Sequence, residues 1–252
     1  MATARRTHSF SESVIRGMTR LADQHGAINL AQGFPNFPTP DILKEAAAKA
    51  IRDDVNQYAI TWGAKRLRHA IAKKYFDWYG MAVDTETEIT VTCGATEAMA
   101  ATLLAIVNPG EEVIVFEPYY ENYGPDAILC DAKPVFVPLQ PGQPLDLDRL
   151  SKAFSDRTRA IIVNTPGNPS GRVLTRAELS GIAELCQRFG TWAVTDEIYE
   201  HIRYQGEHIP MATLPGMRDR TITISGASKT YSIAKRSPRS GASRKKSFRR
   251  RD

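Results

Sequence analysis

Four short stretches of the sequence, each directly after an apolar, β-branched run, carry residues that could bind and transform a small molecule. They are Gly94–Thr96 (GAT), residues 164–171 (NTPGNPSG), Asp196–Tyr199 (DEIY) and Ser225–Tyr231 (SGASKTY). In an open parallel sheet, ligands bind beyond the carboxyl ends of the strands. We therefore expect these four stretches to face one site.

These residues could have a role in binding or catalysis, or they could have an ordinary structural role. A glycine followed by the free N–H groups of a helix start can bind a phosphate, although a packing turn explains the same residues. Asp196 ends an otherwise apolar strand, where an unpaired carboxylate is costly and calls for a cationic partner; a solvated strand end is the alternative. Lys229 lies between small residues after a buried strand. It is either a surface charge or a desolvated amine suited to Schiff-base chemistry.

Taken together, the four stretches match the needs of pyridoxal 5'-phosphate. This cofactor requires a phosphate cradle, a lysine for its aldehyde, an anion for its pyridine nitrogen and donors to its ring oxygen. Lys229 could supply the amine and Asp196 the anion. The remaining assignments are Ala95, Thr96 and Ser228 to the phosphate, and Asn168 and Tyr199 to the ring oxygen.

Longer motifs resemble the fold-type I, class I/II pyridoxal-phosphate-dependent aminotransferases, a group that includes kynurenine, glutamine, methionine and aspartate aminotransferases. The resemblance runs from about residue 10 to residue 233. Its motifs are NLAQGFPNFPTP (29–40), NQYAITWGAKRLRHAIAKKY (56–75), ITVTCGATEA (89–98), NPGEEVIVFEPYYENY (108–123), AIIVNTPGNPSGRV (160–173), VTDEIY (194–199) and SGASKTYS (225–232). The resemblance implies transfer of an amino group from an amino acid to a 2-oxo acid.

The resemblance also assigns roles to single residues. Lys229 would bind the cofactor aldehyde and shuttle the substrate proton, Asp196 would keep the pyridine nitrogen protonated, and Tyr120 would stack on the ring. Gly33 and Asn168 would contact the substrate.

Two further implications concern the assembly and the backbone. Tyr58 would reach the phosphate of a neighbouring subunit, which implies a homodimer with shared sites. The peptide bonds Glu117–Pro118 and Asn168–Pro169 would be cis, because each directs a residue that contacts the cofactor.

The same cofactor residues also serve other reactions. A C–S lyase that works by β-elimination is one alternative, and a non-catalytic remnant of an aminotransferase is another. Product analysis separates transfer from elimination, and the sequence does not.

The elements that would position these residues alternate between strands and helices from residue 88 onward. The expected strands are 88–93, 113–116, 135–137, 160–164, 192–196 and 221–225, and the expected helices are 96–107, 119–130, 147–154 and 175–189. This alternation predicts an α/β fold, a mostly parallel sheet with helices on both faces. The clearest helix opens with a capping box at Thr175 and Glu178, and its apolar residues at positions 179, 182, 183 and 186 follow helical spacing.

The chain before residue 88 has a different character. Residues 1–28 suggest one helix, and a Gly/Pro-rich stretch follows. Thr39 is expected as the N-cap and Pro40 as the first residue of a helix through Ile51. A further helix is expected at Lys65–Tyr79. The expected division is an N-terminal arm and small-domain segment (1–40), an incomplete cofactor-binding large domain (41–233) and a basic, disordered tail (234–252).

The positive charge of the protein is concentrated in that tail. The whole chain carries 33 basic and 28 acidic residues, but residues 234–252 hold nine of the former and one of the latter, so the rest is mildly acidic. A tail with one large apolar residue cannot bury enough surface to fold. Its charge supports non-specific attraction to polyanions, and no specific nucleic-acid partner is expected.

The resemblance breaks off at the tail. In the family, the lysine motif continues into a T-G-W-R segment whose arginine binds the cofactor phosphate, and here that position is Ser237. The family's next strand would lie between the strands near 88–93 and 221–225, and an Arg/Ser-rich tail cannot replace it. A frameshift or truncation is the hypothesis that follows, with weak cofactor binding and impaired transamination as its expected result.

Composition limits the cellular setting. No apolar run is long enough to cross a membrane, and the first residues contain no apolar signal core. Cys93, Cys130 and Cys186 are widely spaced and form no CxxC pair, so we expect free thiols in a reducing cytoplasm and no metal site.

Overall fold

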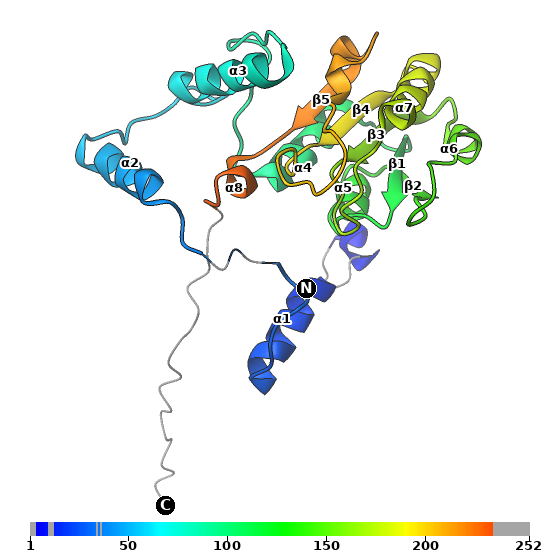
Figure 1. The fold of residues 1–252 in the computed structure, drawn as a ribbon. Coiled ribbons are helices and arrows are strands. Elements are labelled where there is room, and N and C mark those ends of the chain that lie inside the picture. The colour runs from blue at the N-terminus through cyan, green and yellow to red at the C-terminus, as the bar shows by residue number, and fades with distance from the viewer. Residues whose placement is uncertain (1–3, 10–12, 34, 36, 234–252) are drawn as a thin grey trace, which may run out of the picture.

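The structure, a computed structural model, describes residues 4–9, 13–33, 35 and 37–233. The expected basic tail, residues 234–252, lies outside the described residues. Figure 1 shows a sheet with helices on both faces, from which α1 and α2 extend away.

The sheet has five strands, all parallel, in the order β2-β1-β3-β4-β5. They are β1 (Glu112–Glu117), β2 (Lys133–Pro138), β3 (Thr158–Asn164), β4 (Trp192–Asp196) and β5 (Thr221–Ile224). In the register, Asp196 pairs with Asn164 of β3 on one side and with Ile224 of β5 on the other. The carboxyl ends of these three strands are therefore level, and the expected α/β class is confirmed.

Helices cover both faces because the strand residues alternate between them. Val113 and Val115 belong to a buried cluster with residues of α4 (Ala95–Ile106) and α5 (Tyr123–Leu129). Ile114 and Phe116 belong to the cluster on the opposite face, with α6 (Leu147–Ala153) and α7 (Arg176–Phe189). A period of two along each strand thus builds two separate cores on one sheet.

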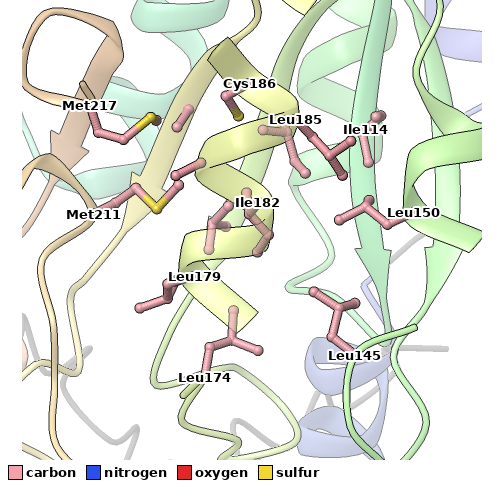
Figure 2. Close-up of a cluster of buried hydrophobic side chains, with 14 of the residues drawn as sticks. Ile114, Leu145, Leu150, Leu174, Leu179, Ile182, Leu185, Cys186, Met211 and Met217 are labelled. Carbon is pink, nitrogen blue, oxygen red and sulfur yellow. The ribbon is translucent and has the colours of Figure 1, made fainter. Parts of the chain in front are cut away.

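Helix α7 follows the sequence prediction closely. The Thr175 side chain accepts a hydrogen bond from the N–H of Glu178, and the Glu178 carboxylate accepts one from the N–H of Thr175, which completes the capping box. Gly190 ends the helix in the left-handed conformation. Figure 2 shows Leu179, Ile182 and Cys186 on its buried side, among the apolar residues of the larger cluster.

The part of the chain before α4 consists of η1 (Arg5–Ser9), α1 (Val14–His25), α2 (Asp41–Arg52) and α3 (Lys65–Tyr79). Helix α3 has the expected bounds. It buries Arg68 and Tyr75, whereas α1 and α2 bury no residue of their own. Within the described part of the chain, only the last of these three α-helices is anchored by buried side chains.

Two short elements lie between β4 and β5, and a third follows β5. They are η2 (Met211–Thr213), η3 (Arg218–Arg220) and α8 (Ala227–Thr230). The last is a single helical turn that carries Lys229 directly beyond the carboxyl end of β5 (Figure 1).

The expected cap of α2 is wrong. The helix begins at Asp41, and Pro40 occupies the N-cap position without a side-chain hydrogen bond. The Thr39 hydroxyl donates instead to the backbone carbonyl of Ser232 at 2.9 Å. The Thr39 hydroxyl, which the local sequence assigned to the helix N-cap, thus forms a hydrogen bond with a residue distant in sequence.

The expected strand at residues 88–93 is also absent. The backbone N–H of Val91 bonds to the carbonyl of Trp62 at 3.0 Å, not to a neighbouring strand. Arg218, just before β5, forms an ion pair with Glu88 at 2.8 Å, so this segment approaches the β5 side of the sheet. The described residues contain no strand that could pair with both this segment and β5. Without such a partner, the segment cannot form the backbone hydrogen bonds of a β-strand.

The expected helix at residues 119–130 is shorter than predicted and spans α5 alone. The N–H of Tyr123 bonds to the carbonyl of Tyr120, so the residues after β1 form a turn before the helix begins. Among the described residues, no helix is long and apolar enough to span a membrane.

The core of α7 gives a direct stability test. Ile182 is fully buried, so Ile182→Ala removes packed methylene groups and leaves a cavity, and we expect the free energy of unfolding to fall by about 2–4 kcal/mol. Urea unfolding followed by circular dichroism measures it. Glu184→Ala, at an exposed position of the same helix, is the control and should change it by less than about 0.5 kcal/mol. Equal losses for the two variants would contradict the packing described.

Candidate functional site

The site is built around the carboxylate of Asp196 at the end of β4. The side chain is buried, with 7% of its residue surface exposed. The hydroxyl of Tyr123, in α5, donates to Oδ2 at 2.6 Å, and the N–H of Ile198 donates to Oδ1 at 3.3 Å. Helix α5 thus fixes the carboxylate from one side, and the turn after β4 fixes it from the other.

The electrostatics of Asp196 are those of a buried acid with no counterion among the described residues. Burial raises the pKa of Asp196, and the nearby Glu197 raises it further, while the hydrogen bonds from Tyr123 and Ile198 lower it in part. The groups of the described chain that influence this pKa include no cation. A ligand that brings a positively charged N–H to this carboxylate would therefore be stabilised.

Residues 164–171 hold an amide side chain beside this carboxylate. The Asn164 amide donates to the backbone carbonyl of Asp196 at 2.8 Å, and its oxygen accepts the N–H of Asn168 at 2.7 Å. The loop closes on itself through the N–H of Gly171, which donates to the carbonyl of Gly167 at 2.7 Å.

The expected cis bonds Glu117–Pro118 and Asn168–Pro169 are both present, together with a third, Thr165–Pro166.

Tyr199 connects the loop to the lysine. Burial raises the pKa of the Tyr199 hydroxyl, with contributions from Asp196 and Tyr120, and a hydrogen bond with the Asn168 side chain opposes that rise. The Nζ atom of Lys229 lies 5.9 Å from the centre of the Tyr199 ring. The ring of Tyr120 lies edge-on to that of Tyr123, with centroids 5.8 Å apart. The structure thus brings Asp196, Asn168, Tyr199, Tyr120 and Lys229 together.

The first residues of two helices, α4 and α8, lie at the carboxyl edge of the sheet. Helix α4 begins at Ala95 and Thr96 after Gly94, whose φ of 101° favours glycine. It packs against β4 and β5. Helices that alternate with parallel strands begin at the carboxyl edge. The Glu97 carboxylate accepts the N–H of Cys93, and the first N–H groups of α4 have no acceptor within the helix. Ser228 lies in α8 beside Lys229 and is partly buried.

The other two expected site residues lie apart from this cluster. Tyr58 is fully exposed in the connection between α2 and α3. Gly33 is exposed in the segment between α1 and α2. Within this chain neither contacts the site, so their functions remain predictions.

The sequence did not single out two residues that the structure places at the centre of the site. Tyr123 donates to Asp196, and Asn164 links that aspartate to Asn168. Asn164 does carry a signal, because it ends an apolar strand and opens the unusual loop. Tyr123 carries little, since three tyrosines follow β1 within six residues and spacing does not say which one turns inward.

The residues present fit pyridoxal phosphate. Asp196 is a buried acceptor without a cation among the described groups that act on it, as a protonated ring nitrogen requires. Tyr199 lies beside it and bonds with the side chain of Asn168, and Lys229 offers a primary amine near Tyr199. The free N–H groups at the start of α4 suit a phosphate.

Comparison with known proteins gives this arrangement a family. Residues 25–236 match the family model described as aminotransferase class I and II. The chain is 44% identical over 233 residues to the probable N-succinyldiaminopimelate aminotransferase DapC of Mycobacterium tuberculosis, covering 91% of this chain and 59% of that protein. It is 39% identical over 228 residues to human kynurenine–oxoglutarate transaminase 1, covering 84% of this chain and 54% of the relative.

Solved structures agree. The structure of N-succinyldiaminopimelate aminotransferase from Mycobacterium tuberculosis superposes with a TM-score of 0.88 at 44% identity, over 91% of this chain and 61% of that one. The fold and the site define a chain of the pyridoxal-phosphate-dependent α/β type. The protein belongs to the class I and II aminotransferases, and it spans about 59% of the length of the first of these relatives.

The uncompensated carboxylate predicts a gain in stability on its removal. A raised pKa in the folded state means that the contribution of Asp196 is most favourable below about pH 4, its usual range, and is lost as the pH rises through the folded-state pKa. In the chain without cofactor we expect Asp196→Asn to raise the free energy of unfolding at pH 8 by about 1–2 kcal/mol, and to change it little at pH 4. Urea unfolding at both values measures this.

Asp148→Asn is the control, because this residue is exposed in the first turn of α6 and should show no such pH-dependent gain. If Asp196→Asn lowered stability at pH 8, the carboxylate would have a compensating partner, and the electrostatic description of the site would be wrong.

Proposed function

We propose that this protein acts in pyridoxal-phosphate-dependent transfer of an amino group from an amino acid to a 2-oxo acid. The observation that carries the proposal is the buried carboxylate of Asp196, on which no cation of the described residues acts, next to a cluster of Tyr199, Asn168 and Lys229. Membership in the aminotransferase family supports it. The particular amino acid and 2-oxo acid are not part of the proposal.

In this proposal Asp196 and Lys229 have the two central roles. Asp196 accepts a hydrogen bond from the protonated ring nitrogen of the cofactor, and the Tyr123 hydroxyl keeps the carboxylate oriented toward it. Lys229 would hold the cofactor through its amine, and the same amine would take and return the proton at the α-carbon of the substrate. When bound, the cofactor supplies a ring that accepts the electron pair left by that proton.

The remaining residues bind and orient. Asn168 and Tyr199 would hold the cofactor through its ring oxygen, and Tyr120 would hold it through the face of its ring. Ala95, Thr96 and Ser228 bind the phosphate through the α4 start and the turn before Lys229. Asn168 also contacts the substrate.

We extend the proposal to a cytoplasmic homodimer with shared sites, in which Tyr58 and Gly33 of one subunit meet cofactor and substrate. Their exposure leaves both accessible to a second subunit. The three cysteines are free, in keeping with a reducing compartment. The division of the chain at residues 40/41 and 233/234 and the impaired activity of these 252 residues also stay predictions.

The test is covalent capture of the cofactor. Purified protein is mixed with pyridoxal phosphate, reduced with borohydride and digested, and the modified lysine is identified by mass spectrometry. We expect the adduct on Lys229, together with a visible absorption band that reduction bleaches. Lys229→Ala should abolish both, whereas Lys152→Ala, at an exposed position of α6, should change neither. An adduct spread over exposed lysines, or none, would falsify the proposed site.

Product analysis then separates transfer from elimination for protein that binds the cofactor. Transfer yields a new amino acid and a new 2-oxo acid, and β-elimination yields ammonia and pyruvate. Release of ammonia without a new amino acid would replace the transferase proposal by the lyase alternative.

A further inference from the structure

A second buried carboxylate lies four residues after Asp196 and faces another part of the molecule. Glu200 is fully buried. Its Oε1 atom accepts hydrogen bonds from the Lys74 ammonium and, at 2.7 Å, from the Ser225 hydroxyl. Its Oε2 atom accepts one from the Tyr79 hydroxyl at 2.5 Å. Both oxygens of this carboxylate are therefore used by the protein itself.

These contacts join three elements that are far apart in sequence. Lys74 and Tyr79 lie in the last turns of α3, and Glu200 lies in the turn that carries Tyr199. Ser225 directly follows β5 and precedes the α8 turn with Lys229. Glu200 is thus a junction between α3, the Tyr199 turn and the Lys229 turn.

The charge balance of Glu200 contrasts with that of Asp196. Burial alone would raise the pKa of Glu200, but the hydrogen bonds from Lys74, Tyr79 and Ser225, with the Lys74 charge, hold it below its usual value. The Lys74 side chain is itself only 17% exposed. The junction is an ionised, satisfied unit, and such a unit fixes the geometry of the elements it joins.

The backbone forms few other contacts that hold the Lys229 turn, and the Thr39 hydroxyl holds only its far end, through the carbonyl of Ser232. Helix α8 is four residues long, too short to be stable by itself. The N–H of Tyr231 bonds to the carbonyl of Ala227 within the turn, and the N–H of Glu197 bonds to the carbonyl of Ile224 at its base. The Ser225 side chain adds a tether between that base and Glu200.

We propose that Glu200 is a positioning residue, which through Ser225 holds the Lys229 turn against the Tyr199 turn while Lys74 neutralises its charge. The proposal rests on the proposed function only for the use made of Lys229. The tether itself exists in the chain without cofactor and can be tested there.

The experiment is hydrogen–deuterium exchange of the cofactor-free, full chain, read by mass spectrometry over residues 225–232. We expect Ser225→Ala to speed exchange in this segment at least about fivefold, because loss of one hydrogen bond of about 1 kcal/mol gives that factor and the Ser225 side chain bonds with Tyr75 as well as with Glu200. We expect β1 and β3 to be unchanged. Ser225→Thr keeps the hydroxyl and should restore the wild-type rate. Glu200→Gln should speed exchange both there and in the last turn of α3.

The matched control is Glu112→Gln. Glu112 is also a buried carboxylate with a serine and a cation, since Ser155 donates at 2.6 Å and Arg157 lies at 3.0 Å, but it begins β1, which β3 and β4 separate from β5 in the sheet. It should leave residues 225–232 unchanged. No local acceleration in Ser225→Ala, acceleration across the whole sheet, or no rescue by threonine would overturn the proposal.

Cofactor capture separates this proposal from the proposed function. If Lys229 forms the adduct but the Ser225 variants exchange like wild type, the positioning role fails alone. If exchange changes as expected but no adduct forms on Lys229, the tether is real and the proposed function fails. When both hold, Ser225→Ala should also shift the visible band of the bound cofactor, and Ser225→Thr should return it.

Discussion

The arrangement of the site depends on one constraint, a carboxylate buried at the end of β4 with no cation among the described groups that act on it. Asp196 holds its position because the Tyr123 hydroxyl and the Ile198 N–H bond to it, and Asn164 bonds to its backbone carbonyl. Helix α5, the loop after β3 and the turn after β4 must all be in place to orient that carboxylate. Burying this carboxylate therefore lowers the stability of the fold, and a cationic ligand that binds to it would neutralise its charge.

Of the three buried acids at residues 196–200, Asp196 and Glu200 differ most clearly in their partners. Glu200 is neutralised by Lys74 and joins α3 to the end of β5, whereas Asp196 is left for a ligand. Tyr199 lies between them in sequence, and its ring lies 5.9 Å from the Lys229 amine. This five-residue stretch therefore carries one buried charge with a counterion, which supports the structure, and one without a counterion among the described residues, which we propose a ligand completes.

Much of the fold could be predicted from the sequence wherever a pattern within a few neighbouring residues decides the structure. The capping box and apolar spacing of α7 and the apolar runs of β1 to β5 were correctly predicted. The structure also brings together most of the residues expected beyond the strand ends, whose roles stay predictions. Prediction failed where a distant partner decides the outcome. Thr39 caps no helix because Ser232 takes its hydroxyl, and residues 88–93 form no strand because no described strand pairs with them. The partners of Asp196 and Glu200 come from other helices, so no spacing rule could identify Tyr123 or Lys74.

The most direct test of the account is the pKa of the Asp196 carboxyl, measured by carbon-13 NMR on aspartate-labelled protein, with Asp196→Asn identifying the signal. The account predicts a pKa above the usual aspartate range in the cofactor-free chain, and a fall of that pKa when pyridoxal phosphate is added, because the ligand brings the missing positive charge. An ordinary pKa without cofactor, or one that does not respond to the cofactor, would contradict the claim that this buried carboxylate defines the site.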